Sequence, residues 1–313
     1  MTLPRRILPG QTLLVTRRCA RRCFFFKPTT RALKIMAYCL AHAVSRFSVQ
    51  IHALFWSTTH YHLVLTDPLG ELPAFMHCLD TNLARSMNAH LGRGESFFAP
   101  DSYSKVELAT TEAVLEKLVY VIVQAVKDGL VRRPERWPGI HSLAADLGKW
   151  TFRAERPNFY FRSEGTKERP ALPEVASFEV TIPPGFEDMT PDAFRAMLSE
   201  RVEAELQAIY ARRKAEGRRR FMGVRAVMAQ NARDAAGDVF PKFEQNPTIA
   251  CGRGQGELRA QLLRQLTAWR GEYRRAWERW RHGEADVVFP AGTYQMRVFY
   301  FVRSGTSPPA LAA

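Results

Sequence analysis

The amino-acid sequence predicts a protein of the α+β class. Extended and helical patterns alternate as strand, helix, strand, strand, helix, strand between residues 11 and 108, which is the order of a ferredoxin-like antiparallel sheet with helices. Prolines and glycines then crowd into residues 151–189, and helical periodicity dominates residues 190–313. We therefore expect a first domain over 1–150, an irregular linker over 151–189 and a mainly helical, basic accessory region over 190–313.

Side-chain periodicity places each element of the first domain. Two runs rich in Ile, Leu, Phe, Trp and Val flank Ser57-Thr58-Thr59 and predict a β-hairpin, and Gly92 is a typical helix end. The expected elements are a strand over 11–17, a helix over 30–46, hairpin strands over 49–56 and 60–66, a helix over 71–91 and a strand over 103–108.

A longer helix follows over residues 110–129. The Thr110-Thr111-Glu112 start offers a threonine cap with an acidic first turn, and Gly129 suits a left-handed end. Most of this helix is apolar, but Glu116, Tyr120, Gln124 and Asp128 form one polar ridge at a spacing of four. Tyr120 is therefore either a core aromatic residue or part of a site that also displays Gln124.

The second hairpin strand carries His60-Tyr61-His62. Because side chains alternate along a strand, His60 and His62 project from one face and Tyr61 from the other. Two imidazoles about 7 Å apart on one face are able to converge on one cation. The alternative is a half-exposed polar face with no ligand.

Bulk composition limits the function classes. The net charge is +14, and residues 1–66 contain ten Lys or Arg and no Asp or Glu. A polyanion partner is the natural inference; a solubilising surface or attraction to an anionic membrane are the alternatives. Our candidates for contacts with a DNA backbone are Arg17, Arg18, Arg21 and Arg22, with a second basic patch at Arg218, Arg219 and Arg220. The neighbouring Phe24, Phe25 and Phe26 suit either base stacking or the core.

No apolar run is long enough to span a membrane and no signal peptide is evident, so we expect a cytoplasmic protein without a membrane partner, associated with the nucleoid when bound to DNA. Five scattered cysteines predict buried free thiols rather than disulfides or a zinc site.

The accessory region has two long expected helices. Thr190-Pro191-Asp192 starts one that runs to about Gly217, and the other covers 257–282 with Trp269, Trp277 and Trp280, which we interpret as packing residues. The segment GRRRFMGVRAVMAQ between them is either a helix that contacts DNA or a charged surface.

Several pieces resemble the HUH single-tyrosine transposases, in particular the REP-associated branch, over roughly residues 8–142. They are Pro9-Gly10 before VTRR, Arg22-Cys23-Phe24, the strand HYHLVL, and the helix YVIVQAVKDGLV with Trp137-Pro138 beyond it. The resemblance implies that His60, His62 and Gln124 bind the metal and that Tyr120 is the nucleophile. Three residues depart from the family pattern: Thr59 replaces an asparagine, Ala125 a proline, and Asp128 a small residue.

The same resemblance implies metal-dependent nicking and rejoining of single-stranded DNA through a 5′-phosphotyrosine, at hairpins or palindromic repeats, with Mg²⁺ or Mn²⁺. The protein is expected to be a monomer or a homodimer. The main alternative is a domesticated relative without catalysis that only binds nucleic acid; a structural or regulatory RNA-binding module is a third.

Overall fold

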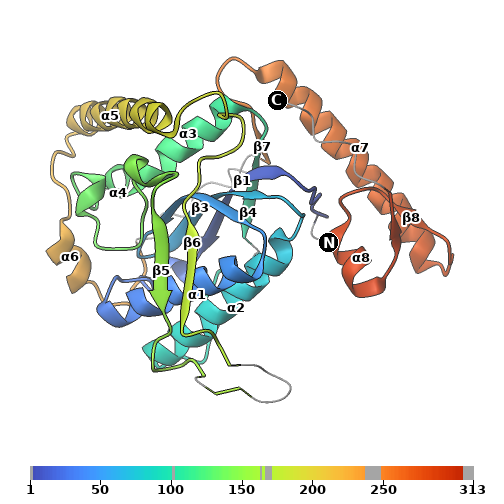
Figure 1. Cartoon of the computed structure of the whole chain (residues 1–313), viewed down its shortest axis with the longest axis horizontal. Helices are drawn as coiled ribbons and strands as arrows, with labels where there is room; N and C mark the ends of the chain where they lie inside the picture. Colours follow the sequence, from blue (N-terminus) through green and yellow to red (C-terminus); the bar gives the residue numbers. More distant parts are fainter. Residues whose placement is uncertain (1–2, 101–102, 163, 166–170, 237–247, 306–313) are drawn as a thin grey trace.

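A five-stranded mixed sheet forms the centre of the computed structural model, which describes residues 3–100, 103–162, 164–165, 171–236 and 248–305 (Figure 1). The strand order is β2-β3-β1-β4-β7. The first four strands are antiparallel to their neighbours, and β7 is parallel to β4. The α+β class is confirmed. The strands are β1 (Gln11–Arg18), β2 (Gln50–Trp56), β3 (His60–Asp67), β4 (Ser104–Leu108) and β7 (Ile249–Ala250).

The register of β1 and β3 assigns their side chains to opposite faces of the sheet. Thr16 is opposite His62, and Arg17 is opposite Tyr61. Tyr61 donates a 2.5 Å hydrogen bond to Asp80 in α2 (Leu72–Leu91), on the helix-covered face. Because neighbouring residues alternate, His60 and His62 point to the other face, as the sequence predicts.

The helices of the first domain begin and end where the sequence indicates. α1 (Thr30–Arg46) starts after Thr29, whose side chain accepts a hydrogen bond from the amide of Ala32. α2 ends at Gly92, which adopts a left-handed conformation that glycine tolerates without cost. α1 and α2 contact each other along their length.

The long helix expected over 110–129 is divided at Val123. The Thr110 side chain caps α3 (Thr111–Ile122), and α4 (Gln124–Lys127) follows after Val123, whose ψ of 1° is not helical. Hydrogen bonds from Val123 to Val119 and from Lys127 to Val123 bridge the irregularity. The polar ridge of Tyr120 and Gln124 is therefore continuous across the break.

Residues 151–189 are not an irregular linker. β5 (Thr151–Glu155) and β6 (Val175–Glu179) form an antiparallel pair that packs on α1, and Phe152 and Phe178 stack with their ring centroids 4.9 Å apart. Both rings belong to the main core. In each strand buried and exposed residues alternate, so one face packs on the core even though the segment as a whole is rich in proline. Residues 163 and 166–170, within the expected linker, lie outside the described residues.

The region after residue 190 divides between two parts of the molecule. α5 (Pro191–Ala215), capped by Thr190, buries Phe194 and Leu198 in the main core. By contrast, α7 (Gly256–Arg281) forms smaller clusters beside the N-terminal segment (Figure 1). The remaining short elements are η1 (Ala20–Arg22), η2 (Pro134–Arg136), η3 (Ala144–Asp146), α6 (Val224–Ala229), β8 (Val288–Phe289), α8 (Tyr294–Tyr300) and β9 (Arg303–Ser304).

Several side chains with two possible roles lie in the core. Phe25 and Phe26 are buried, so the rings stabilise the fold instead of offering a face to a base. All five cysteines are free thiols, and four of them are buried. None of the described helices is long and apolar enough to cross a membrane.

Candidate active site

The two histidines of β3 lie closer together than strand geometry alone suggests. The ring centroids of His60 and His62 are 4.7 Å apart and their planes are inclined by 79°. The rise of a strand separates alternate residues by about 7 Å at the backbone. The imidazoles therefore lean toward each other, an arrangement that suits a shared ligand.

A threonine hydroxyl contacts the Nδ1 atom of each imidazole. Thr59 Oγ1 lies 2.9 Å from His60 Nδ1, and Thr16 Oγ1 lies 2.8 Å from His62 Nδ1. His62 Nε2 is buried and has no hydrogen-bond partner among the described residues. If each Nδ1–H donates to its threonine, each Nε2 keeps a lone pair, which is the tautomer that binds a metal through Nε2.

Both imidazoles are neutral at neutral pH. Burial lowers the pKa of His60 to about 4, with further contributions from Arg18 and Arg22. Burial, followed by the charges of His60 and Arg18, lowers the pKa of His62 well below its usual value. Since only a neutral imidazole has a lone pair to donate, the environment keeps both rings in the form that binds metal.

Tyr120 faces the histidines from α3. Its ring packs edge-on against His62, with centroids 5.4 Å apart and planes at 78°. The side chain is partly buried against the core. Burial, and secondarily the nearby Asp128, raises the pKa of the Tyr120 hydroxyl, whereas Arg18 opposes the shift. The structure thus brings the expected nucleophile to the histidine pair, but its hydroxyl is protonated at neutral pH.

Gln124 contributes a third acceptor from the turn after Tyr120. The side chain is buried; its Nε2 donates a 2.9 Å hydrogen bond to Asp128 Oδ1, and its Oε1 has no partner among the described residues. The Asp128 carboxylate therefore fixes which end of the amide is left free. Loss of solvation raises the pKa of the Asp128 carboxyl to about 6, although the residue is partly exposed, and Gln124 and Lys127 oppose the shift.

The residues fit a divalent cation. Buried polar atoms almost always find a partner, and here His62 Nε2 and Gln124 Oε1 both lack one. Each of the three candidate ligands has its other polar atom held by Thr59, Thr16 or Asp128. No three His, Cys, Asp or Glu side chains are grouped as a metal site in the described part of the chain, and the candidate third ligand is the amide of Gln124. Two nitrogens and one oxygen suit Mn²⁺ better than Mg²⁺, which prefers oxygen.

Two lysines border the Tyr120 ring. The ammonium of Lys127 lies 4.2 Å from the ring centroid and that of Lys117 lies 5.4 Å from it. Our reading of the sequence missed both residues. The helical spacing could have identified them: Lys117 stands three residues before Tyr120 and Lys127 seven after it, and such positions share one side of a helix.

Two solved structures resemble this one. A REP-associated tyrosine transposase bound to a REP hairpin has 16% identity and a TM-score of 0.41, over 48% of this chain and 86% of that chain. A transposase described as putative, from Deinococcus radiodurans, has 18% identity and a TM-score of 0.29, over 41% and 97%. No protein-family model and no curated protein sequence matches the chain.

The first basic patch lies partly at this site. Arg18 is exposed at the end of β1, and its charge lowers the pKa of both histidines. Arg21 and Arg22 follow in η1 with φ of 52° and 56°, a left-handed conformation that costs on the order of 1–3 kcal/mol per residue. Residues 234–236 hold this loop through hydrogen bonds to the backbone of Phe24 and Arg22.

Arg17 does not belong to this patch. Its guanidinium points to the opposite face of the sheet, where Nε lies 3.2 Å from Asp80 Oδ2 and Cζ lies 4.6 Å from the Phe98 ring centroid. The alternation of strand side chains separates it from Arg18. Arg17 therefore does not share a surface with Arg18, and a contact between Arg17 and DNA stays a prediction.

The second basic patch lies beside the end of α4. The amide of Met222 donates a 2.9 Å hydrogen bond to the carbonyl of Gly129, just after α4, and Gly223 bonds to Leu130. Arg218 pairs with Glu216, and the Arg213 guanidinium donates to the carbonyl of Arg220. Arg218, Arg219 and Arg220 therefore lie near the end of α4, although about a hundred residues separate them from Tyr120 in sequence.

Proposed function

We propose that this protein is a transposase-like enzyme that nicks and rejoins single-stranded DNA through a covalent 5′-phosphotyrosine at Tyr120, with a divalent metal ion. One observation supports the proposal: the Tyr120 ring packs against His62 on one face of the sheet, and His62 Nε2 and Gln124 Oε1 are buried acceptors without a partner among the described residues. His60 completes the set from the same strand.

The sheet topology supports a ferredoxin-like assignment for the first domain. The elements run β1, α1, β2, β3, α2, β4, and the antiparallel strands lie in the order β2-β3-β1-β4. This arrangement places β1 and β3 at the centre of the sheet. The histidine pair is therefore held by two rigid neighbouring strands, which fixes the positions of the ligands.

The chemical step uses the phenol oxygen of Tyr120. That oxygen forms a bond to a DNA phosphorus while the bond from phosphorus to the 3′-oxygen breaks. The phenol loses its proton and the released 3′-oxygen gains one, so the exchange is balanced. The new phosphodiester conserves the energy of the old one, and a 3′-hydroxyl is able to reverse the step without nucleotide hydrolysis.

The protein residues divide the remaining tasks. Mg²⁺ or Mn²⁺, when bound, supplies Lewis-acid polarisation of the phosphate. His60, His62 and Gln124 hold it, and Thr59, Thr16 and Asp128 orient these ligands. Lys117 and Lys127 place positive charge beside the phenol, where negative charge develops as its proton leaves.

The proposed substrate is unpaired DNA beside a hairpin or palindromic repeat. Tyr120 is partly buried at the junction of a strand and a helix, so it does not reach a phosphate within a stacked duplex without distortion. Arg18 and Arg22 near His60, and residues 218–220 near the end of α4, supply positive charge that suits a flexible sugar-phosphate chain. The hairpin preference follows from the resemblance of the motifs.

A covalent-adduct assay tests the proposal. A labelled oligonucleotide with a hairpin and a single-stranded flank is incubated with the protein and Mn²⁺, and denaturing electrophoresis detects protein-linked DNA. We expect an adduct with the native protein, none with Tyr120→Phe, and none when EDTA replaces Mn²⁺. Tyr160→Phe is the matched control, because it also removes a phenol oxygen. Tyr160 is exposed and lies far from the histidines in the sequence.

Binding measurements separate the enzyme from its main alternative. His60→Ala should abolish the adduct and leave most DNA binding intact. Salt-sensitive binding without an adduct in the native protein, over a panel of hairpins and both metals, would instead support the domesticated binding protein. Equal loss of binding and cleavage in His60→Ala would show that the histidine has a structural role.

A further inference from the structure

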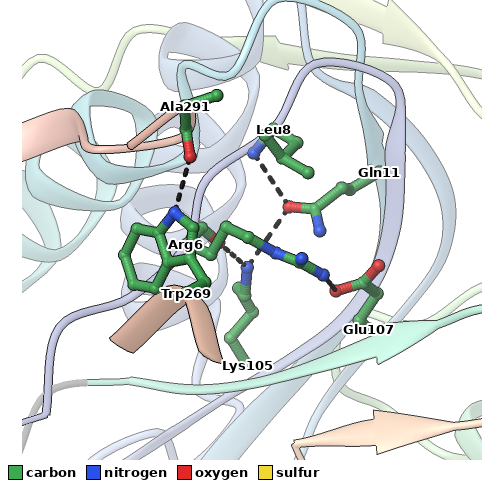
Figure 2. Close-up of polar contacts among 7 residues, drawn as sticks. All are labelled: Arg6, Leu8, Gln11, Lys105, Glu107, Trp269 and Ala291. Carbon is green, nitrogen blue, oxygen red and sulfur yellow. Dashed lines mark hydrogen bonds and ion pairs between the residues drawn. The ribbon is translucent and has the colours of Figure 1, made fainter. Parts of the chain in front are cut away.

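A second site lies on the other face of the sheet. A cavity of about 1040 Å³ opens between the N-terminal segment, α2, β4 and α7. The N-terminal segment forms one wall and is fixed to the C-terminal region, since Ile7 donates a 3.0 Å hydrogen bond to Gly292. Figure 2 shows how this wall is built: Trp269 in α7 donates to the carbonyl of Ala291, and Lys105 in β4 donates to the carbonyl of Arg6.

The cavity is strongly cationic. Six of its lining side chains are Lys or Arg and two are Asp or Glu. Both carboxylates already have partners: Asp80 pairs with Arg17, and Glu107 lies 3.7 Å from the Arg6 guanidinium. The lining cations are Arg5, Arg6, Arg17, Lys105, Arg270 and Arg274.

Lys105 shows the effect of this crowding. Its ammonium donates one hydrogen bond of 2.6 Å to the carbonyl of Arg6 and another of 3.3 Å to Gln11 Oε1 (Figure 2). Burial lowers the pKa of Lys105 to about 8, with Glu107 opposing and the charges of Arg6 and Arg5 adding to the shift. An anion in the cavity would relieve the repulsion among these three cations.

One face of α7 contributes alternating cations and aromatic rings. Arg270, Tyr273, Arg274 and Trp277 all line the cavity, at positions that share one side of a helix. Arg270 Nε is buried without a hydrogen-bond partner among the described residues, and no described carboxylate forms an ion pair with Arg270 or Arg274. Tyr294 adds a further ring from another segment, whereas the Tyr103 ring is buried beneath the Arg5 guanidinium, whose Cζ lies 4.3 Å from its centroid.

This cavity is distinct from the histidine site. Arg17 lines the cavity, whereas its neighbour Arg18 influences the histidines from the opposite face of β1. Tyr61, between the two histidines, reaches Asp80 on the cavity side. The sheet itself therefore separates the two sites.

We propose that this cavity binds unpaired nucleotides of single-stranded DNA away from the cleavage site, with the arginines of α7 on phosphates and the aromatic side chains stacked on bases. The inference rests on the proposed function only for the choice of DNA as the polyanion. Positive grooves interleaved with aromatic rings are the usual design of sites for single strands. The cavity volume of about 1040 Å³ slightly exceeds the ~300–1,000 Å³ of small-ligand pockets, which is enough for nucleotides.

The test compares two double variants of the full-length protein with equal loss of charge. Arg270→Gln with Arg274→Gln alters the cavity, and Arg264→Gln with Arg275→Gln alters exposed positions of α7 outside its lining. Affinity for a fluorescent single-stranded 20-mer is measured in EDTA over a series of salt concentrations. Circular dichroism and thermal unfolding confirm that both variants fold.

We expect the cavity variant to bind at least tenfold more weakly at low salt and to lose about 1.4 from the slope of log affinity against log salt, or about 0.7 per phosphate contact. The affinity of the matched Arg264→Gln, Arg275→Gln variant for the 20-mer should change by less than threefold. Equal weakening of both variants would mean that only bulk charge acts, and would overturn the site. Equal competition by duplex DNA of the same length would overturn the single-strand assignment.

A second readout addresses stacking. Bound single-stranded DNA should quench the intrinsic fluorescence of the native protein, and Trp277→Phe should remove part of that quenching, whereas Trp150→Phe, outside the cavity, should not. Unchanged quenching in Trp277→Phe would contradict base stacking at this wall. Because these measurements use EDTA and do not require Tyr120, they succeed or fail independently of the cleavage assay.

Discussion

The ring of Tyr120 packs edge-on against the imidazole of His62, with ring centroids 5.4 Å apart. This contact joins a helix to a strand more than fifty residues earlier in the chain. It places the proposed nucleophile and the proposed metal ligands in one site, and the experiments below test what each neighbour contributes.

Asp128 is predicted to act as a positioning residue for Gln124. Asp128→Ala removes the acceptor of the Gln124 amide, so the orientation of that amide is no longer fixed. We expect Mn²⁺ affinity, measured by electron paramagnetic resonance without DNA, to fall about 10–100-fold, the range typical for loss of an outer-shell partner. Asp128→Asn keeps an acceptor oxygen, so its Mn²⁺ affinity should fall less than threefold. Unchanged affinity in Asp128→Ala would refute this role.

Lys127 is predicted to assist the reaction without holding the metal. Lys127→Gln removes the cation 4.2 Å from the Tyr120 ring, and adduct formation should slow about tenfold because the developing phenolate loses electrostatic support. Mn²⁺ affinity should not fall, because the Lys127 charge, which also lowers the pKa of His62, opposes cation binding. Lys34→Gln, an exposed site on α1 at the other face of the sheet, is the control. Similar rates for the two variants would show that Lys127 has no such role.

His52 is predicted to make stability depend on pH. It is fully buried in β2, contacts Thr66 Oγ1 at 2.8 Å, and burial lowers its pKa to about 4. An unfolded histidine titrates near 6.5, so the unfolded state binds more protons between pH 6.5 and 4. The stability from the neutral ring is complete above pH 6.5 and declines as pH falls toward 4.

Urea unfolding at pH 7 and pH 5 measures this effect. The decrease in unfolding free energy between these values should be about 2 kcal/mol smaller in His52→Gln than in the native protein. His60 and His62 change stability in the same direction, and the raised pKa values of Asp80 and Asp128 act oppositely. These contributions are common to both proteins, so an identical pH dependence in the two would contradict the prediction.

Gly139 is predicted to be intolerant of a methyl group. A Cβ atom there would lie 2.3 Å from Trp137 Nε1 and 3.0 Å from the carbonyl of Trp56, which are joined by a 2.8 Å hydrogen bond. Gly139→Ala should lower the unfolding free energy by about 1–3 kcal/mol through overpacking. Gly94→Ala is the matched control because no atom lies within 4 Å of its Cβ. Equal stability of the two variants would rule out this packing constraint.

Local signals in the sequence were sufficient for most elements. Thr110 and Thr190 cap helices as expected, Gly92 ends one, and Tyr61 points away from its two histidine neighbours. These features depend on backbone periodicity and on hydrogen bonds between near neighbours. The strand pair within 151–189 was missed because its evidence, alternate burial against α1, exists only after folding.

By itself, the sequence determined the α+β class, the shared face of His60 and His62, and the ridge that carries Tyr120 and Gln124. Only the tertiary structure decided that Tyr120 faces His62, that Lys127 lies over the Tyr120 ring, that Asp128 binds the Gln124 amide, and that Arg17 turns away to Asp80. It alone formed the cationic cavity, whose walls come from residues near both ends of the chain. The physical reason is that periodicity fixes the direction of a side chain within its element, whereas its partners depend on how distant elements pack.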